Sequence, residues 1–404
     1  MTTETLDAVV VGGGPAGATA AHELATSGRR VALLDRAGRI KPCGGAIPPR
    51  LIRDFAIPDH LIVARITAAR MIAPSAREVD MPIEGSGYVG MVDREHFDEF
   101  LRVRAAEAGA ERHTGSFERI ERDADGTAIV VYATKAGDEV RLRARTVIGA
   151  DGAKSRVAKQ EVPVAAKVPC VFAYHEIVES PPDRTGRFDA RRCDVFYQGR
   201  HSPDFYSWIF PHGPVTSIGT GSAHKGFSLR GSIAELRRTV GLDGQKLIRH
   251  EGAPIPMKPA RRWDNGRDVV LAGDAAGVVA PASGEGLYYA MVGGQFAAKA
   301  VQACLATGDA RALRLARKQF MRAHGRVFWI LGIMQYFWYS SEKRREKFVS
   351  ICQDKDVQRL TWESYMNKQL VRRDPWAHLR IFFKDLAHLF GLEQIAARLE
   401  RPKA

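Results

Sequence analysis

Short apolar runs alternate with amphipathic stretches at the start of the chain. Residues 6–11 (LDAVVV) and 30–34 (RVALL) are mostly apolar and predict two buried strands. Residues 15–27, between them, predict a helix. A strand, a helix and a second strand in this order are typical of a βαβ unit, in which the two strands run parallel.

The same pattern returns in two later parts of the chain. Residues 91–110 (MVDREHFDEFLRVRAAEAGA) predict an amphipathic helix after a short extended piece. Residues 146–151 (TVIGAD) and 268–277 (DVVLAGDAAG) each predict an apolar strand that ends at an aspartate, and a long helix is expected over 284–305. We therefore predict one parallel α/β nucleotide domain that is assembled from separate segments.

The middle and the end of the chain have other patterns. Residues 168–222 hold short β-rich runs between turn residues and predict an antiparallel sheet. From residue 311 onward the pattern is helical and includes the aromatic stretch VFWILGIMQYFWY, residues 327–339. The predicted fold is α/β, with a discontinuous Rossmann-like domain (1–60, 86–160 and 262–310), an inserted antiparallel-sheet substrate domain (61–85 and 161–261) and a C-terminal helical region (311–404).

Composition narrows the class of protein. A length of 404 residues suggests two or three domains. The net charge of +14 is spread along the chain, and no zinc-finger or RNP-type signature accompanies it, so nucleic acid is not an expected partner. The five cysteines are scattered without a CxxC pair, which predicts neither a disulfide framework nor a metal site and favours the cytoplasm. We see no export signal and no membrane-spanning run.

A glycine motif follows the first predicted strand. Gly12, Gly14 and Gly17 have GxGxxG spacing and open the first predicted helix. The first glycine allows a tight turn, the second lets a pyrophosphate approach the backbone, and the third permits close packing of the helix on the strand. Asp35 ends the second strand, where a carboxylate binds ribose hydroxyls. Together these features predict a dinucleotide site.

Two further segments favour FAD as the dinucleotide. VIGADGAKSR places Asp151 after a strand, and VVLAGDAAG does the same for Asp274. An aspartate at a strand end can hold ribitol or ribose hydroxyls. The small residues of AAG and SGEGL, which follow Asp274, would let the backbone approach the pyrophosphate and the flavin ring.

The motifs GGGPAG, DG and GDAAG together resemble the flavin-dependent enzymes that have the hydroxybenzoate hydroxylase fold. Within that group, KPCGGAIPPRLI, PDFYSWIFP and GDAAGVVAPASGEGLYYA resemble the geranylgeranyl reductase family. The tail SSEKRREKFVSICQDKDVQRLTWESYMNKQLV is similar to the chlorophyll and bacteriochlorophyll branch of that family. The resemblance covers nearly the whole chain.

This resemblance implies an FAD enzyme that saturates isolated double bonds of a geranylgeranyl chain. It implies NADPH as the co-substrate that reduces the flavin, with ferredoxin as the rival donor, and a second GxGxxG motif for NADPH is absent from the sequence. The positions that match FAD contacts of the family are Gly17, Asp35, Cys43, Gly44, Ala46, Arg94, Phe117, Asp274, Gly286 and Leu287. Many archaeal relatives have Glu where this chain has Asp35, and a carboxylate is kept.

The stretch PDFYSWIFP, called here the aromatic segment (residues 203–211), suits the chemistry of such a reaction. Saturating an isolated alkene develops positive charge at a tertiary carbon, and an aromatic face stabilises a desolvated cation by up to about 2 kcal/mol. Tyr206 and Trp208 alternate with other residues along a predicted strand and so share one face. We interpret them as catalytic lining of a prenyl channel. The alternative is an ordinary aromatic sheet core.

Cys43 is the third candidate for the reaction. It lies in a loop bounded by proline and glycine, and in the family's fold that loop runs beside the flavin. The thiol would donate a proton or shape the flavin's face. The alternative is that Cys43 is a small buried apolar residue.

The function predicted from these features is reduction of a geranylgeranyl chain to phytyl, with the chain free as the diphosphate or esterified to a pigment. The expected place is the cytoplasm, peripheral to the photosynthetic intracytoplasmic membrane, because residues 327–339 stand beside Lys343, Arg344, Arg345 and Lys347. Three alternatives are an archaeal-type geranylgeranyl phospholipid reductase, an aromatic monooxygenase and a non-enzymatic prenyl-binding flavoprotein.

Overall fold

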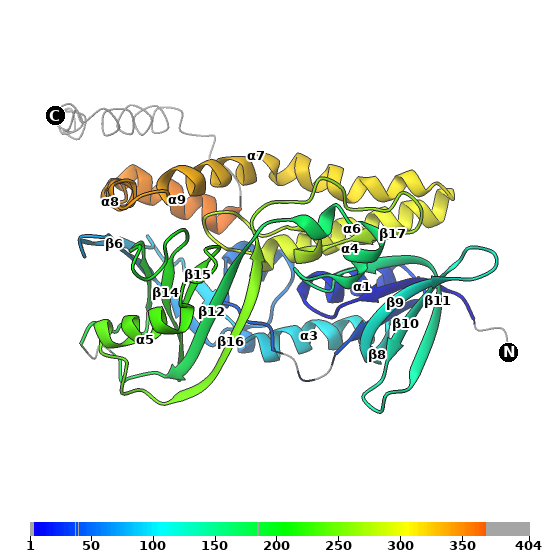
Figure 1. The fold of residues 1–404 in the computed structure, drawn as a ribbon, viewed down its shortest axis with the longest axis horizontal. Helices are drawn as coiled ribbons and strands as arrows, with labels where there is room; N and C mark the ends of the chain where they lie inside the picture. The colour runs from blue at the N-terminus through cyan, green and yellow to red at the C-terminus, as the bar shows by residue number, and fades with distance from the viewer. Residues whose placement is uncertain (1–3, 37, 39, 184–185, 369–404) are drawn as a thin grey trace. The chain divides into compact units, whose positions relative to one another are not determined.

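The computed structural model describes residues 4–36, 38, 40–183 and 186–368 (Figure 1). The chain forms two compact units, which are described separately below. The first unit contains Met1–Gly45, Val92–Ala173 and Glu251–Ile333, and the second contains Ala46–Met91, Tyr174–His250 and Met334–Ala404. Of the predicted helical region 311–404, residues 311–333 belong to the first unit and the described residues 334–368 to the second.

A seven-stranded sheet forms the centre of the first unit. Its parallel part pairs β8 with β2, β2 with β1, β1 with β11 and β11 with β17, while β9 and β10 extend it as antiparallel strands. The opening βαβ unit is present as the sequence predicts. The strands are β1 (Leu6–Val11), β2 (Val31–Asp35), β8 (Glu111–Thr114), β9 (Ser116–Arg122), β10 (Ala128–Ala133), β11 (Glu139–Gly149) and β17 (Val269–Leu271).

The long helices of the first unit pack closely because they carry small residues where they meet. A Cβ atom at Gly294 of α6 would lie 2.2 Å from the Ala16 carbonyl oxygen of α1. Phe320 and Phe328 of α7 pack against Tyr289 of α6, which explains why most of α7, up to Ile333, belongs to this unit. The helices are α1 (Pro15–Thr26), α3 (Arg94–Glu107), α4 (Arg156–Glu161), η2 (Ala165–Lys167), η3 (Gly273–Ala276), α6 (Leu287–Thr307), η4 (Ala310–Arg314) and α7 (Leu315–Trp338).

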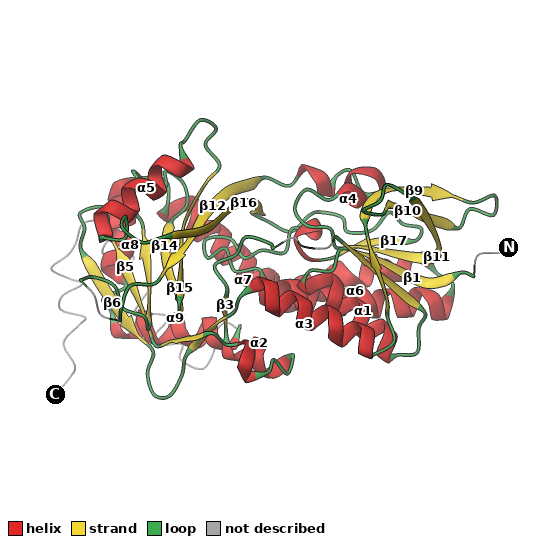
Figure 2. Ribbon diagram, turned by 90° about the horizontal axis from the view of Figure 1, so that it is seen from below, coloured by secondary structure: helices red, strands yellow, loops and turns green. Residues whose placement is uncertain are grey.

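The second unit is built on another seven-stranded sheet, in the order β16-β12-β15-β14-β13-β5-β6 (Figure 2). The pairs β13–β14, β14–β15 and β5–β6 are antiparallel, but β13 and β5 run parallel. These two strands lie far apart in the sequence, so no hairpin motif could predict their pairing. The strands are β5 (Ala68–Ile72), β6 (Glu78–Pro82), β12 (Cys170–Glu179), β13 (Arg192–Phe196), β14 (Ser207–His212), β15 (Val215–Ser222) and β16 (Leu247–Pro256). By the bounds given above, the start of β12, up to Ala173, and the end of β16, from Glu251, are counted with the first unit.

The remaining elements of the second unit are short. A small sheet in the order β3-β7-β4 joins β3 (Ala46–Ile47), β4 (Ala64–Ile66) and β7 (Val89–Met91). The helices are α2 (Pro49–Asp54), η1 (Asp59–Leu61), α5 (Leu229–Val240), α8 (Glu342–Ile351) and α9 (Lys355–Asn367).

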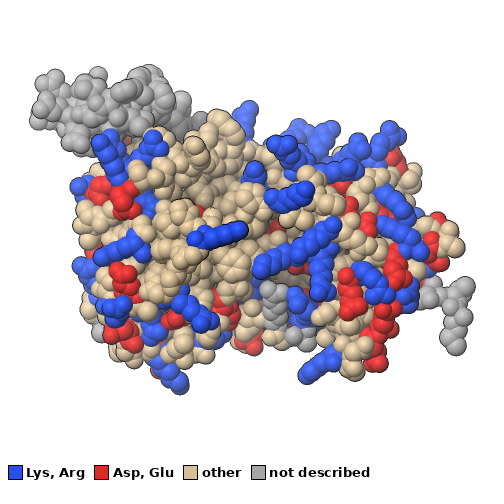
Figure 3. Space-filling view, in the orientation of Figure 1, with Lys and Arg blue, Asp and Glu red and all other residues tan. Residues whose placement is uncertain are grey.

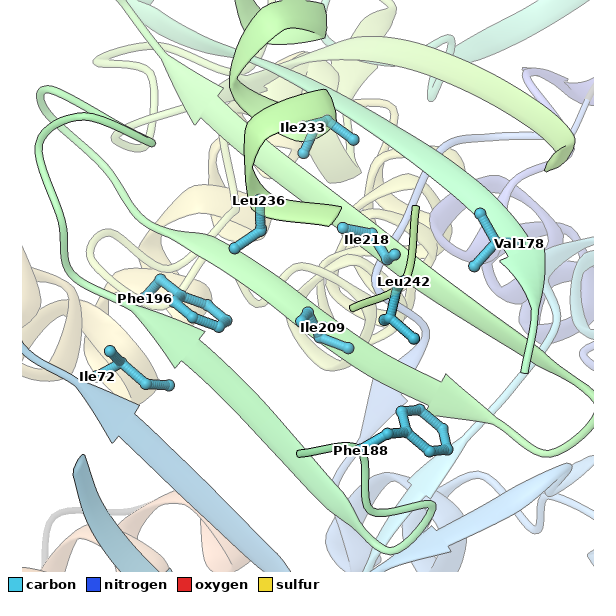
Figure 4. Packing of buried hydrophobic residues seen from close by; sticks show 9 residues of the cluster. All are labelled: Ile72, Val178, Phe188, Phe196, Ile209, Ile218, Ile233, Leu236 and Leu242. Carbon is cyan, nitrogen blue, oxygen red and sulfur yellow. The ribbon is translucent and has the colours of Figure 1, made fainter. Parts of the chain in front are cut away.

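One face of the large sheet in the second unit is an aliphatic core under α5 (Figure 4). Ile233 and Leu236 of α5 are buried against Ile209 of β14 and Ile218 of β15. Ser228 caps the helix by accepting the amide of Gly231, and left-handed Gly241 ends it. Burial of these side chains stabilises the sheet by roughly 1.5–3 kcal/mol for each large aliphatic residue.

His201 lies deep in the second unit and has an unusual environment. Its side chain is 0% exposed, and neither ring nitrogen has a hydrogen-bond partner among the described residues. Burial and the charge of Arg200 lower the pKa of His201 from 6.5 to about 4, against the opposing charge of Glu235. The imidazole is therefore neutral in the folded protein at neutral pH.

This environment predicts acid sensitivity. Between pH 6.5 and pH 4 the unfolded chain binds a proton at His201 that the folded chain rejects. The free energy of unfolding is therefore fully maintained above pH 6.5 and should fall by about 1–2 kcal/mol at pH 5 from this group. Urea denaturation of the wild type and of His201→Leu at pH 7 and pH 5 measures the difference. An equal pH dependence in both proteins would contradict the prediction.

Candidate functional site

The glycine loop between β1 and α1 is shaped by close backbone contacts. Gly12 has φ +107°, and a Cβ atom at Gly17 would lie only 1.8 Å from the Gly12 carbonyl oxygen. Gly14 behaves differently, because a Cβ atom there would meet no heavy atom within 4 Å among the described residues, its immediate chain neighbours aside. Gly14 is also the N-cap of α1 and makes no side-chain cap hydrogen bond. Open space in front of the helix N-terminus is the feature that a pyrophosphate requires.

Asp35 ends β2 beside this loop. Its carboxylate is 3.2 Å from Nη1 of Arg102, and the same nitrogen donates to the Gly13 carbonyl at 3.2 Å. Arg102 is fixed in turn by Glu99, whose Oε2 accepts from Nε at 2.8 Å. Asp35 is thus held in place at the strand end by an arginine of α3. The sequence motif predicts Asp35 at this position, but it gives no signal for Arg102.

Asp274 follows β17 within η3 and approaches the same end of the unit. Its carboxylate, 9% exposed, forms an ion pair with Lys41. A Cβ atom at the preceding Gly273 would lie 2.7 Å from the Cβ atom of Ala16 in α1. The structure therefore brings Asp274 and Gly273 close to Lys41 and to the start of α1.

Gly286 and Leu287 mark the start of α6. Gly286 is the N-cap and makes no side-chain cap hydrogen bond, and Leu287 is 5% exposed. A second helix N-terminus of the first unit is therefore capped by glycine. Their predicted contact with FAD stays a prediction.

Cys43 interacts with a buried ion pair of α3. Arg94 Nε and Nη2 donate to the two oxygens of Asp98 at 2.8 and 2.6 Å, with both side chains under a tenth exposed. Arg94 also hydrogen-bonds the half-buried Cys43. Burial, the largest single effect, lowers the pKa of Arg94, but the charges and hydrogen bonds of Asp98 and Cys43 together outweigh it and raise the pKa. Arg94 is a permanent cation beside the thiol.

The other predicted FAD contacts are placed as follows. The Asp151 carboxylate accepts from the backbone amides of Arg156 (2.6 Å) and Val157 (3.2 Å), the first two residues of α4, whose N-cap is Ser155. Burial raises the pKa of Asp151 against these hydrogen bonds. The Phe117 carbonyl accepts from Arg156 at 2.9 Å. The Asp151 carboxylate and the Phe117 carbonyl thus already accept hydrogen bonds from the chain itself, and their contact with FAD stays a prediction.

Two further positions are expected to contact FAD. Gly44 lies in the Cys43 loop, and Ala46 pairs with Met91 in the second unit.

The aromatic segment lies in the second unit, at the start of β14. Tyr206 and Trp208 are in ring contact at 5.9 Å, and Trp208 contacts Phe210 at 6.1 Å. Ile209 points to the core under α5, so the predicted alternation of faces is present. Trp208 lies flat over β15, since a Cβ atom at Gly219 would be 2.0 Å from its ring.

Trp208 also takes part in a buried polar chain that sequence reasoning missed. Its Nε1 donates to Ser217 Oγ at 3.1 Å, and that hydroxyl is 3.0 Å from Nδ1 of His175. Ser217 is fully buried. The partner strand supplies this serine two residues before Gly219, and only the strand register reveals the contact.

The described residues contain neither a metal-binding cluster nor a helix suited to span a membrane. Among residues 4–368, apart from the few positions that are not described, no three His, Cys, Asp or Glu residues gather in a way that could hold a metal ion. Within the same part of the chain, none of the helices combines the length and the apolar character needed to cross a bilayer.

Comparison with known proteins decides the family. The chain is 59% identical to a geranylgeranyl diphosphate reductase of Rhodobacter capsulatus over 96% of its own length and 98% of that protein. The chain belongs to the geranylgeranyl diphosphate reductase family. A chloroplastic member from Oryza sativa is 36% identical over 98% of this chain and 89% of the relative. The resemblance predicted from the sequence motifs is confirmed.

Two domain families match separate parts of the chain, and solved structures share its fold. The family described as "FAD binding domain" matches residues 5–170, and the one described as "Lycopene cyclase protein" matches residues 214–386. A geranylgeranyl bacteriochlorophyll reductase-like protein from Thermoplasma acidophilum has the same fold, with a TM-score of 0.78 at 21% identity, covering 93% of this chain and 99% of that one. The flavin-dependent brominase Bmp2 also shares the fold, with a TM-score of 0.74 at 18% identity over 96% of this chain and all of that one.

The predicted α/β fold is therefore confirmed, and this member of the reductase family is an FAD-dependent oxidoreductase. The glycine loop fits the cofactor, because Gly14 leaves open space before the free amides of α1. Asp35 and Asp274 supply carboxylates at two strand ends for ribose or ribitol hydroxyls.

Asp274→Ala is expected to weaken FAD retention about ten- to hundredfold, because a charged hydrogen-bond acceptor contributes roughly 1.5–3 kcal/mol. Flavin absorbance after extensive dialysis measures the retained cofactor. Glu118→Ala, which removes an exposed carboxylate of β9 in the same unit, is the matched control and should keep its flavin. Undiminished flavin content in Asp274→Ala would remove Asp274 from the site.

Proposed function

We propose that this enzyme saturates three double bonds of a geranylgeranyl chain and so produces phytyl for photosynthetic pigments. The chain would be carried by diphosphate, by (bacterio)chlorophyll, or by either. The observation that supports this substrate most strongly is the 59% identity to the Rhodobacter capsulatus enzyme named geranylgeranyl diphosphate reductase. An archaeal digeranylgeranylglycerophospholipid reductase of Methanopyrus kandleri is only 31% identical, over 78% of this chain.

Each saturation adds one hydride and one proton across a carbon–carbon double bond. Reduced FAD, when bound, supplies the hydride. Tyr206 and Trp208 would face the positive charge that develops at the tertiary carbon, and their rings would exclude water from it. Cys43 would give the proton to the other carbon, with Arg94 offering a positive charge to the thiolate that remains. Each turnover then consumes two electrons from an external donor.

NADPH is the proposed donor, with ferredoxin as the rival. The basic chain, with a net charge of +14, would favour either the extra phosphate of NADPH or an acidic protein. Steady-state turnover with NADPH, NADH or reduced ferredoxin distinguishes them.

Anaerobic incubation with dithionite tests the reaction and the substrate together. With geranylgeranyl diphosphate or the geranylgeranyl pigment ester, mass spectrometry is expected to show products that gain two, four and six hydrogens. Incorporation of oxygen in an aerobic control would indicate a monooxygenase instead. Binding of the prenyl chain without any gain in mass would indicate a prenyl-binding flavoprotein.

We further propose that the outer face of α7 attaches the enzyme peripherally to an anionic membrane. Trp329, Ile333 and Tyr336 are 69%, 48% and 86% exposed and follow one another at helical spacing, so they form one stripe. Exposed Arg322 and Arg326 continue this stripe toward the N-terminus of the helix. Figure 3 shows Lys and Arg side chains gathered over that half of α7.

The basic cluster predicted from the sequence, at residues 343–347, is only partly suited to membrane attachment. Arg345 is only 1% exposed in its side chain and cannot face a lipid surface. Arg344 is exposed and lies over the ring of Phe337, at 4.3 Å from its centre. Phe328, within the same aromatic stretch, is buried against Tyr289. The stretch 327–339 is thus interior on one side and exposed on the other.

Replacing Trp329 and Tyr336 by Ser is expected to weaken binding to liposomes that contain anionic lipid. Reversing Arg322 and Arg326 to Glu should weaken it as well, because each basic residue near the surface adds about 1 kcal/mol. Lys135→Glu with Lys225→Glu makes the same change in charge at other exposed positions and is the control. Cosedimentation at low and high salt measures binding. Equal binding to neutral and anionic liposomes would contradict the electrostatic part.

A further inference from the structure

The second unit contains a buried arginine, Arg345, to which no role in the reaction has been given so far. The side chain of Arg345 in α8 is 1% exposed. Its Nη1 donates to the Ser202 carbonyl at 2.6 Å, its Nη2 donates to the Pro203 carbonyl, and its Nε and Nη2 donate to the Tyr339 carbonyl at 3.2 and 3.0 Å. Three backbone carbonyls therefore accept hydrogen bonds from the guanidinium group.

No carboxylate pairs closely with this buried charge among the described residues. Glu342 approaches Arg345 only to 3.8 Å and is 56% exposed. Its carboxylate accepts the Gly199 amide at 2.8 Å. Removing a charge from water costs several kcal/mol, and carbonyl dipoles repay it only where they are rigidly oriented. The arrangement therefore holds the backbone of residues 202–203 in a single geometry.

The backbone carbonyl of His201, just before those of Ser202 and Pro203, is also held by hydrogen bonds. The His201 carbonyl accepts hydroxyls from Ser207 (3.1 Å), Thr220 (2.6 Å) and Ser232 (2.7 Å). Ser202 Oγ accepts the Phe205 amide at 2.9 Å. Side chains from α5, α8, β14 and β15 thus fix three successive carbonyls, which lead directly into the aromatic segment.

The rings of the aromatic segment follow this turn directly in the chain and pack against one another. Phe205 is 0% exposed and stacks on Tyr206 at 4.2 Å and 26°. Tyr206 contacts Tyr197 at 6.2 Å, and Tyr197 contacts Tyr339 at 5.5 Å and Phe348 at 5.0 Å. Tyr339, which follows α7 directly, and Phe348 of α8 therefore belong to the same aromatic cluster as Tyr206.

We propose that Arg345 is a positioning residue, which sets the place of Tyr206 and Trp208 through the carbonyls of residues 202 and 203. The role rests on the proposed function, in which these two rings face the reacting prenyl chain. A planar guanidinium has donors that spread over three carbonyls, whereas the single ammonium of a lysine cannot reach all three. The charge is therefore less important here than the shape of the donor group.

Arg345→Lys tests this role because it keeps the positive charge but removes the guanidinium donors that reach three carbonyls. The holoenzyme is assayed anaerobically with geranylgeranyl diphosphate, and alkene reduction is expected to fall roughly ten- to hundredfold. KM for the prenyl substrate should rise, and products with two or four added hydrogens should accumulate. FAD content and flavin reduction by dithionite should stay unchanged.

Two neighbours serve as matched controls. Arg344→Lys changes the exposed adjacent residue, and Glu342→Gln removes the distant carboxylate while keeping a side-chain oxygen for the Gly199 amide. Both variants should retain wild-type KM and product distribution. Thr220→Val removes one hydroxyl from the His201 carbonyl without changing any charge, and it should give the Arg345→Lys signature in a milder form.

The outcomes separate the two proposals. A wild-type enzyme that adds no hydrogen to either prenyl substrate contradicts the proposed function. An active wild type with unchanged KM and products in Arg345→Lys overturns the role of Arg345 alone. If Arg345→Lys does not fold, Thr220→Val decides: altered KM and products support positioning, and wild-type behaviour overturns it. Equal loss of flavin reduction and alkene reduction in a folded variant also overturns it.

Discussion

The Gly12 carbonyl oxygen lies where a side chain at residue 17 would have to begin. This contact presses the start of α1 against the end of β1, and it leaves the amides of the helix N-terminus facing open space at Gly14. A second close approach, between Gly294 of α6 and Ala16, holds the other long helix against α1. The cofactor cradle therefore depends on small residues at contacts that no side chain could occupy.

Charged side chains around this cradle are ordered by ion pairs within the first unit. Arg102 holds Asp35, Lys41 pairs with Asp274, and Asp98 holds Arg94 beside Cys43. Three residues expected from the motifs are thus each accompanied by a partner of opposite charge. Ordering of this kind lowers the cost of placing polar groups against a bound dinucleotide.

In the second unit, close packing on a glycine and buried hydrogen bonds, rather than ion pairs, position the aromatic rings. Trp208 lies on the bare backbone of Gly219, and a buried arginine with three hydroxyls fixes the turn that leads into the aromatic segment. Trp208 is only 6% exposed and its ring packs on Gly219, so its interpretation as lining of a prenyl channel stays a prediction. Ile209 and Phe205 are core residues, while Tyr206, Trp208 and Phe210 share the other face.

The sequence by itself determined the βαβ opening, the glycine loop, the strand-end aspartates and the reductase family, because each depends on spacing along a continuous stretch. Tertiary structure alone decided the parallel pairing of β13 with β5, the division of the C-terminal helices between two units and the burial of Arg345. Arg344 and Arg345 are alike as neighbours in a basic run, and only the carbonyls of residues 202, 203 and 339 distinguish them. Such partners are over a hundred positions away or on another element, so no local pattern encodes them.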